Sequence, residues 1–243
     1  MPTLFISDLH LDEAAPEITA RCLAFLQGEA RGAAALYVLG DLFEAYLGDD
    51  DQPAWREPVL DAFRALAASG TALYFLPGNR DFLLGQAFAT RAGGTALPDP
   101  FELQLYGTRV LVTHGDALCT DDRPYQTLRA TVRDPKWQRA ALSLSLASRQ
   151  AFAAAARQGS KQHTAQQQAM LMDVNAAAVE HVLRGSGCSV LLHGHTHRPG
   201  QHEVVVDGRT CQRLVLGDWY TQRSALRWDE QGPAWFPASP KPT

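Results

Sequence analysis

The stretch Val190-Leu-Leu-His-Gly-His-Thr-His197 decides the fold expected of this chain: a short apolar run ends in a glycine flanked by histidines. Four more apolar runs end in a comparable way, in the order Asp8-Leu-His10, Gly40-Asp41, Gly78-Asn79 and His114-Gly115. In open α/β sheets, the carboxyl ends of the strands form the crevice in which ligands bind. We therefore expect these polar side chains to converge, although they are far apart in sequence.

Their chemistry indicates a metal site. Side chains at positions i and i+2 of an extended segment point the same way, so Asp8 and His10 can act together, as can His195 and His197. The preceding glycines at positions 40, 78 and 194 let the backbone turn sharply and approach an ion. The donors are oxygen and nitrogen without thiolate, which suits manganese, iron or zinc better than calcium. Seven candidate ligands exceed one tetrahedral site, which predicts two metals sharing a bridging carboxylate.

Between these blocks, strand patterns alternate with helix patterns, and the later strands are joined by the turns Tyr106-Gly107 and Asp207-Gly208. Strands are expected at 3–7, 35–39, 72–76, 101–105, 109–113, 189–193, 202–206 and 213–216, and helices at 16–30, 54–69 and 165–184. This alternation predicts an α/β fold with sheets covered by helices. The Pro-rich end is expected to fray from Gly232.

Composition limits the function classes. The chain has 243 residues, 46% of them hydrophobic, and a net charge of −4, which disfavours a generic nucleic-acid coat. The N-terminal residues lack the pattern of a signal peptide, and no apolar run is long enough to span a bilayer. The four scattered cysteines are expected to be small buried thiols of a cytoplasmic protein.

The segment 123–161 interrupts the strand–helix alternation and is predicted to be a helical insertion. It contains eight basic residues and one acidic residue, a net charge of +7, which leaves −11 for the rest of the chain. If 137–158 forms one helix, Leu142 and Leu146 share a face with Arg149, and Trp137, Leu144, Ala151 and Ala155 lie roughly opposite. One face would pack on the protein and the other would meet acyl chains or a bilayer surface. Burial of both faces in a small helical subdomain is the alternative.

Taken in order, the five blocks resemble the calcineurin-like metallophosphoesterase superfamily. The resemblance implies a two-sheet β-sandwich flanked by helices, here with the insertion as a lid. It also implies that one metal is held by Asp8, His10, Asp41 and His197, and the other by Asp41, Asn79, His114 and His195. The corresponding domains are a core of 1–122 and 162–235, a basic lid of 123–161 and a frayed tail of 236–243.

A centre of this kind would activate a water for hydrolysis of a phosphorus–oxygen bond, without a covalent intermediate. Many superfamily members have histidine where this chain has Arg80. An arginine there offers a planar fork to a phosphate, so we expect it to contact the transition state.

Further blocks resemble a narrower family, the UDP-2,3-diacylglucosamine diphosphatases of the lipid A pathway. They are Gly78-Asn-Arg-Asp81, His114-Gly-Asp-Ala-Leu-Cys-Thr-Asp-Asp122, Met172-Asp-Val-Asn175 and Leu216-Gly-Asp-Trp-Tyr220. The resemblance implies attack at the α-phosphate to give UMP and 2,3-diacylglucosamine 1-phosphate. It further implies two Mn²⁺ ions and a peripheral position on the cytoplasmic face of the inner membrane. The charge distribution, in turn, predicts no nucleic-acid partner.

That family's substrate contacts map to Asn79, Arg80, Asp122, Ser160 and His195. The chain departs from the family at Thr164 and Gln167, where asparagine and lysine are common, so these two positions are not assigned. His193, Asp81, Asp116 and Asp121 are left as residues that could orient ligand histidines or cap turns.

Two other functions remain open at this stage. A metallophosphoesterase acting on a soluble nucleotide or phosphoprotein would work equally well with and without acyl chains. A non-catalytic scaffold of the same fold would be expected to have lost ligands, whereas all seven are present here. A nuclease is disfavoured because the basic residues cluster in one insertion instead of along a groove.

Overall fold

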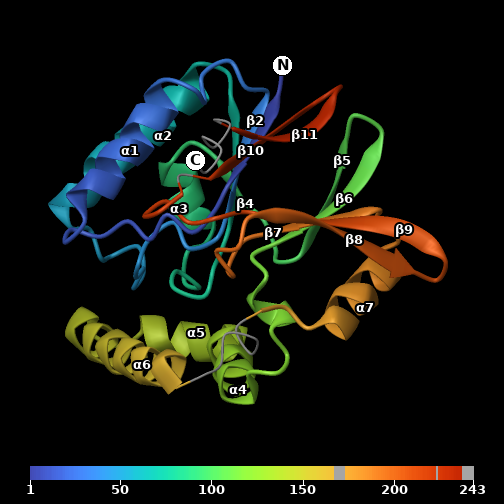
Figure 1. Cartoon of the computed structure of the whole chain (residues 1–243). Helices are drawn as coiled ribbons and strands as arrows, with labels where there is room; N and C mark the ends of the chain where they lie inside the picture. The colour runs from blue at the N-terminus through green and yellow to red at the C-terminus, as the bar shows by residue number, and fades with distance from the viewer. Residues whose placement is uncertain (167–172, 223, 237–243) are drawn as a thin grey trace.

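Two β-sheets stacked face to face form the body of the protein. The computed structural model describes residues 1–166, 173–222 and 224–236, with side chains on the last insertion helix described as far as Ala156. The first sheet has the strand order β11-β10-β1-β2-β3-β4, with β1–β4 parallel. The second has the order β5-β6-β7-β9-β8, in which β6, β7 and β9 run parallel. The predicted two-sheet sandwich flanked by helices is confirmed (Figure 1).

The strands of the first sheet are β1 (Thr3–Ile6), β2 (Ala35–Leu39), β3 (Ala72–Leu76), β4 (Thr95–Ala96), β10 (Ala225–Asp229) and β11 (Gly232–Phe236). Those of the second are β5 (Phe101–Leu105), β6 (Thr108–Thr113), β7 (Val190–His193), β8 (Gly200–Val206) and β9 (Arg209–Val215). The helices are α1 (Pro16–Gln27), α2 (Glu57–Ala68), α3 (Gln86–Arg91), α4 (Arg123–Val132), α5 (Pro135–Leu142), α6 (Leu146–Gln166) and α7 (Ala176–Ser186), with 3₁₀ turns at Ala54–Arg56 and Asp116–Leu118.

Alternating side chains along each strand divide the core into layers. On β1, Leu4 and Ile6 pack toward α1 and α2, whereas Phe5 lies in the cluster between the two sheets. Val112 of β6 and Leu192 of β7 meet Phe5 in that cluster from the second sheet. A third cluster covers the outer face of the second sheet with α7. All four cysteines are free and buried, as the sequence predicts.

Three secondary-structure predictions are wrong. The end of the chain does not fray from Gly232, because β11 pairs with β10 through Phe236. A single helix over 165–184 does not form: residues 173–175 are not helical, and α7 begins only after Asn175, whose side chain accepts a hydrogen bond from the N–H of Ala178. The insertion is helical, but residues 143–145 separate α5 from α6, so 137–158 is not one helix.

The insertion helices α4, α5 and α6 lie together at one end of the sandwich, away from α1, α2 and α7 (Figure 1). Among the described residues, no helix is both long and apolar enough to cross a membrane.

Candidate metal centre

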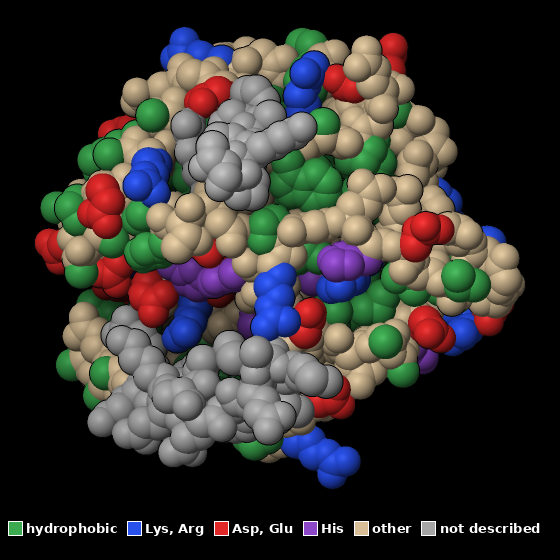
Figure 2. Space-filling model, in the orientation of Figure 1, with side chains coloured by type: hydrophobic (Ala, Val, Ile, Leu, Met, Phe, Trp, Pro, Cys, Tyr) green, Lys and Arg blue, Asp and Glu red, His purple; other side chains and the backbone are tan. Residues whose placement is uncertain are grey.

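The predicted ligands lie where strands of both sheets end. Asp8 and His10 follow β1, Asp41 follows β2 and Asn79 follows β3; His114 follows β6, and His195 and His197 follow β7. β1, β2 and β3 are parallel to one another, as are β6 and β7, so each sheet brings its loops to one edge. Histidines gather on this face in a furrow bordered by acidic and basic side chains (Figure 2).

The backbone at these ligands adopts an uncommon conformation. Asp8, His10, Asp41, His195 and His197 all have positive φ angles, between 48° and 66°. The only other non-glycine residues with positive φ in the described chain are Tyr106 and Asp207, each in a hairpin turn before glycine. Left-handed backbone costs a non-glycine residue about 1–2 kcal/mol, so the fold holds these five candidate ligands against a local preference.

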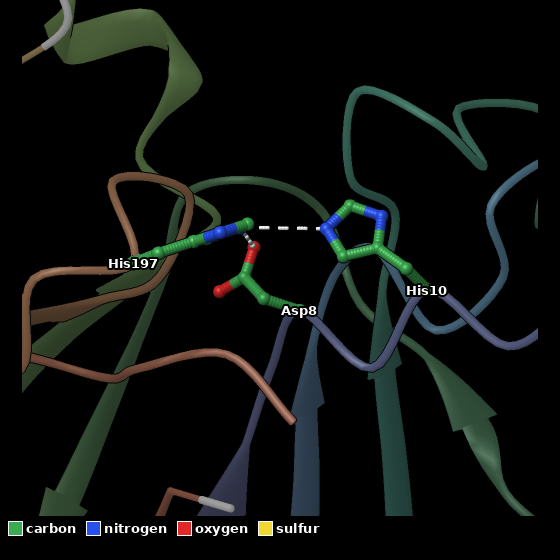
Figure 3. Close-up of side chains that lie close together, drawn as sticks. All are labelled: Asp8, His10 and His197. Atoms are coloured by element: carbon green, nitrogen blue, oxygen red, sulfur yellow. Dashed lines mark hydrogen bonds and ion pairs between the residues drawn. The ribbon is translucent and has the colours of Figure 1, made fainter. Parts of the chain in front are cut away.

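One group of donors contains Asp8, His10 and His197. The Nε2 atoms of His10 and His197 are 3.4 Å apart, and Oδ1 of Asp8 lies 3.3 Å from His197 Nε2. The three side chains come from two distant segments and point toward one another (Figure 3). Asp41 joins the group from β2, with Oδ2 3.6 Å from His10 Nε2.

A second group surrounds Asn79. Its Oδ1 lies 2.8 Å from both His114 Nε2 and His195 Nδ1. The other ring nitrogen of His114 faces the carbonyl of Leu39 at 2.9 Å, which leaves Nε2 for the site. Oδ1 of Asp41 lies 3.7 Å from His114 Nε2, so Asp41 faces both groups. The structure thus brings all seven predicted residues together.

The donors fit divalent metal ions. Ligand atoms of Asp8, His10 and His197 lie within 4.8 Å of one another, and so do those of Asp8, Asp41 and His114. The second of these groups combines residues that the resemblance divides between two metals, which is consistent with a compact shared centre. The Asp8 and Asp41 side chains are 0% and 2% exposed. Two carboxylates buried this close together repel each other unless cations neutralise them.

Burial and charge set the protonation of these groups. Burial opposes ionisation of Asp8, but the hydrogen bond with His197 and nearby histidines hold its pKa below the usual value. Burial also opposes charge on His114, yet Asp41 and Asp8 raise its pKa to about 9. Burial lowers the pKa of His195 to about 4, helped by the neighbouring His114. Without metal and at neutral pH, the site therefore contains a cationic imidazole, His114, and a neutral one, His195, next to its carboxylates.

The structure shows hydrogen bonds at three of the residues to which the sequence alone assigns no definite role, Asp81, His193 and Asp121. Asp81 accepts hydrogen bonds from the backbone N–H groups of Gly78 and Asp41, and therefore links two ligand loops. His193 Nδ1 faces the carbonyl of Gly194, beside the ligand loop. Asp121 accepts from the amide of Asn175, the residue that caps α7.

Asp116 anchors the insertion to the core. Its carboxylate accepts hydrogen bonds from Tyr125 Oη at 2.6 Å and Arg129 Nε at 2.9 Å, both on α4. Arg133, which follows α4, donates to the carbonyls of Pro77 and Gly78, directly before Asn79. A second anchor joins Arg149 of α6 to Asp50 and the carbonyl of Leu47. Part of the insertion's positive charge therefore forms ion pairs with carboxylates of the core.

A pocket of about 390 Å³ lies between the core and the insertion, next to the candidate metal centre. Asn79, Arg80, Glu44 and Arg133 form polar parts of its lining. The remaining wall is mostly apolar and includes Leu47, Phe82, Leu83, Leu128, Val132, Trp137, Ala140, Ala141, Leu144, Phe152, Ala153 and Ala156.

The lining of the pocket shows that the predicted division of the insertion into two faces is wrong. Trp137 and Leu144 line it together with Arg149, which the single-helix interpretation places on the opposite face. Leu142 is not among the lining residues and is 43% exposed. The break at residues 143–145 changes the direction of the chain, so one helical wheel cannot describe both α5 and α6.

The predicted substrate contacts are placed unevenly. Asn79 and Arg80 line the pocket, and His195 lies beside Asn79. Asp122 is the N-cap of α4 and accepts a hydrogen bond from the N–H of Tyr125 at 3.0 Å. Ser160 and Thr164 lie on α6 beyond the described side chains, and Gln167 lies outside the described residues.

Sequence reasoning missed Glu44 and the α4 residues Tyr125 and Arg129. Glu44 contacts His10 and approaches Arg80, but it follows no apolar strand and has no i, i+2 partner. In the sequence, Arg129 is one of eight basic residues of the insertion and has no feature that sets it apart. No spacing signal in the sequence points to these contacts, because they join segments that only the fold brings together.

Comparison with known proteins identifies the family. The model of the calcineurin-like phosphoesterase family matches residues 1–199. UDP-2,3-diacylglucosamine hydrolase of Aromatoleum aromaticum is 52% identical over 233 residues, 96% of this chain and 95% of the relative. The protein of that name from Stenotrophomonas maltophilia is 51% identical over 239 residues, 96% of each chain. A solved archaeal phosphodiesterase, 12% identical, aligns over 97% of this chain and 100% of its own with a TM-score of 0.47. On the family model and the sequence relatives, the chain belongs to the calcineurin-like phosphoesterase family.

Proposed function

We propose that this protein hydrolyses the pyrophosphate bond of UDP-2,3-diacylglucosamine at the α-phosphate, giving UMP and 2,3-diacylglucosamine 1-phosphate in lipid A biosynthesis. The observation that carries the proposal is the pocket, which joins a polar end at Asn79 and Arg80 to an apolar wall from the insertion. A molecule with a diphosphate and two acyl chains matches both parts. The names of the sequence relatives support the same substrate.

The seven clustered residues would hold two Mn²⁺ ions. Asp8, His10, Asp41 and His197 would bind one, and Asp41, Asn79, His114 and His195 the other, with Asp41 shared. Mixed carboxylate, amide and imidazole donors suit manganese and do not exclude iron or zinc. When bound, such cations lower the pKa of a coordinated water and neutralise charge on the phosphoryl oxygens.

The chain's own residues would bind and orient the substrate. The guanidinium of Arg80, 27% exposed at the pocket, can donate two parallel hydrogen bonds to phosphate oxygens as charge develops. Asp122, Ser160 and His195 would complete the contacts with the substrate. The apolar wall would bind the acyl chains and hold the diphosphate near the donors, which favours attack through orientation.

The division into a core of 1–122 and 162–235 and a lid of 123–161 is part of this proposal. Arg123, Lys136 and Arg139 of the insertion are exposed. They would attract anionic lipid head groups and hold the protein at the cytoplasmic face of the inner membrane.

The deciding experiment compares turnover of the diacylated UDP-sugar with that of its deacylated analogue, with manganese supplied. We expect a strong preference for the diacylated substrate and loss of activity after chelation, restored by manganese. Equal rates on both substrates would favour the alternative, a metallophosphoesterase of soluble nucleotides. Activity that survives exhaustive chelation would contradict the two-metal proposal.

A further inference from the structure

Glu44 lies at the junction between the candidate metal centre and the substrate pocket. It follows Asp41 by three residues, and its side chain is 24% exposed and lines the pocket. Its Oε2 lies 3.1 Å from Nδ1 of His10, and its Oε1 lies 3.9 Å from Nη1 of Arg80. One carboxylate thus approaches a candidate metal ligand on one side and the candidate phosphate contact on the other.

The contact between Glu44 and His10 favours one tautomer of the imidazole. A neutral imidazole carries its proton on one nitrogen, and a carboxylate beside Nδ1 favours the proton there. Nε2 is then left with a free lone pair, and this is the atom that lies 3.4 Å from His197 Nε2 and 3.6 Å from Asp41. The backbone of His10 is fixed as well, because its carbonyl accepts a hydrogen bond from Tyr220 Oη at 2.9 Å.

The candidate ligand histidines His10, His114 and His197 differ in the group that faces Nδ1. The corresponding nitrogen of His114 faces a backbone carbonyl, that of Leu39, which no side-chain substitution removes. Nδ1 of His197 lies 3.9 Å from Asp218, which is beyond hydrogen-bond distance. Among the contacts that the structure describes at the Nδ1 atoms of these three rings, His10–Glu44 is the one hydrogen bond to a carboxylate.

We propose that Glu44 is a positioning residue that holds His10 in the tautomer and orientation needed to bind metal. The inference rests on the proposed metal centre and extends it. Carboxylates that orient a ligand histidine typically change metal affinity by 10- to 100-fold when they are removed. Glu44 acts through His10 and does not itself supply a ligand or a proton.

The test measures Mn²⁺ affinity directly, by titration with detection of free Mn²⁺ by electron paramagnetic resonance. Glu44→Ala is expected to weaken one of two Mn²⁺ sites by about 10- to 100-fold, and Glu44→Gln much less, because an amide oxygen still accepts from Nδ1–H. Activity of Glu44→Ala should recover as Mn²⁺ is raised. Glu13→Gln, an exposed residue near His10 in sequence, is the matched control and should bind Mn²⁺ as the unmodified protein does.

A double-mutant cycle separates this inference from the proposal on which it rests. His10→Ala should weaken the same site, and Glu44→Ala added to it should cause no further loss. Normal affinity in His10→Ala would overturn the assignment of the metal ligands. Weak binding in His10→Ala together with normal binding in Glu44→Ala would overturn the role of Glu44 alone. Activity of Glu44→Ala that stays low at saturating Mn²⁺ would also overturn it, because the residue would then act on substrate.

A measurement on the unmodified protein covers the case in which Glu44→Ala fails to fold. In the metal-free protein, at a pH at which His10 is neutral, ¹⁵N NMR reports which nitrogen of His10 carries the proton. A protonated Nδ1 supports the inference, and a protonated Nε2 overturns it.

Discussion

Oδ2 of Asp81 accepts a hydrogen bond of 2.8 Å from the backbone N–H of Leu42. The other carboxylate oxygen accepts from the N–H groups of Gly78 and Asp41 at 2.7 and 3.2 Å. Asp81 is fully buried, and its hydrogen bonds join the loops that present Asp41 and Asn79. The geometry of the candidate centre thus depends on a carboxylate that is not one of its ligands.

We expect Asp81→Asn to lower the free energy of unfolding by about 1–3 kcal/mol, because one side of an amide cannot accept hydrogen bonds and buried N–H groups lose their partner. Urea unfolding measures the change. Glu203→Gln, the same chemical change at an exposed strand position, is the control and should have no effect. Equal stability of both variants would contradict the linking role of Asp81.

Metal affinity should depend on pH through His114. Burial disfavours its charged form, but Asp41 and Asp8 outweigh burial and raise its pKa from 6.5 to about 9 in the metal-free protein. The stability that this proton contributes is complete below pH 6.5 and is lost as the pH rises through about 9. A metal must displace the proton, so Mn²⁺ affinity should fall about tenfold per pH unit between pH 8 and 7.

Mn²⁺ titration in buffers of different ionisation enthalpy would detect the released proton. Binding that is equally tight at pH 7 and 8, with no proton release, would show that His114 is already neutral.

Arg80→Ala should reduce kcat/KM by about 100-fold, because charge-assisted hydrogen bonds contribute about 1.5–3 kcal/mol each. The backbone N–H of residue 80, which donates to Asp41 Oδ1 at 2.8 Å, is retained in the variant. Mn²⁺ affinity and folding should therefore be unchanged. Arg80→Lys keeps the charge without the planar fork and should recover only part of the activity. Normal turnover in Arg80→Ala would rule out the phosphate role.

Two neighbouring leucines test whether the apolar wall binds acyl chains. Leu144 lines the pocket and Leu142 does not, although they are 53% and 43% exposed. Leu144→Ser should raise the KM for the diacylated substrate severalfold, since partial burial of a leucine on binding contributes on the order of 1 kcal/mol. Leu142→Ser should leave the KM unchanged. The same KM in both variants, or an equal change with the deacylated analogue, would show that the apolar wall does not bind the acyl chains.

The convergence of the candidate ligands is predictable from the sequence, because this convergence follows from the order of the strands. The apolar runs at 35–39, 72–76 and 101–105 coincide with strands, and the polar residues after the parallel strands meet at one edge. β11 was missed because it contains Pro233, which cannot donate to a sheet and is tolerated at an edge. β4, with only two residues, is too short to show any pattern.

The helical insertion shows which features of the fold the sequence does not predict. Alanine and leucine indicate helix throughout 137–158, and the turn at 143–145 contains Ser143 and Ser145, which local propensity alone does not distinguish from helix. The contacts of Arg133, Arg149 and Glu44 depend on tertiary packing across 50 or more residues, or on loops brought together by the sheets. Composition showed that the insertion is basic, but not which of its charges anchor it.

The left-handed backbone at Asp8, His10, Asp41, His195 and His197 has a consequence for evolution and engineering. Glycine would relieve the local preference at each of these positions, at the expense of a metal donor. Selection for a robust scaffold and selection for chemistry therefore act in opposite directions at the same residues. Screens that reward thermal stability in the absence of metal should enrich inactive glycine variants at these positions, so stabilised versions of this protein have to be selected in its metal-loaded, working state.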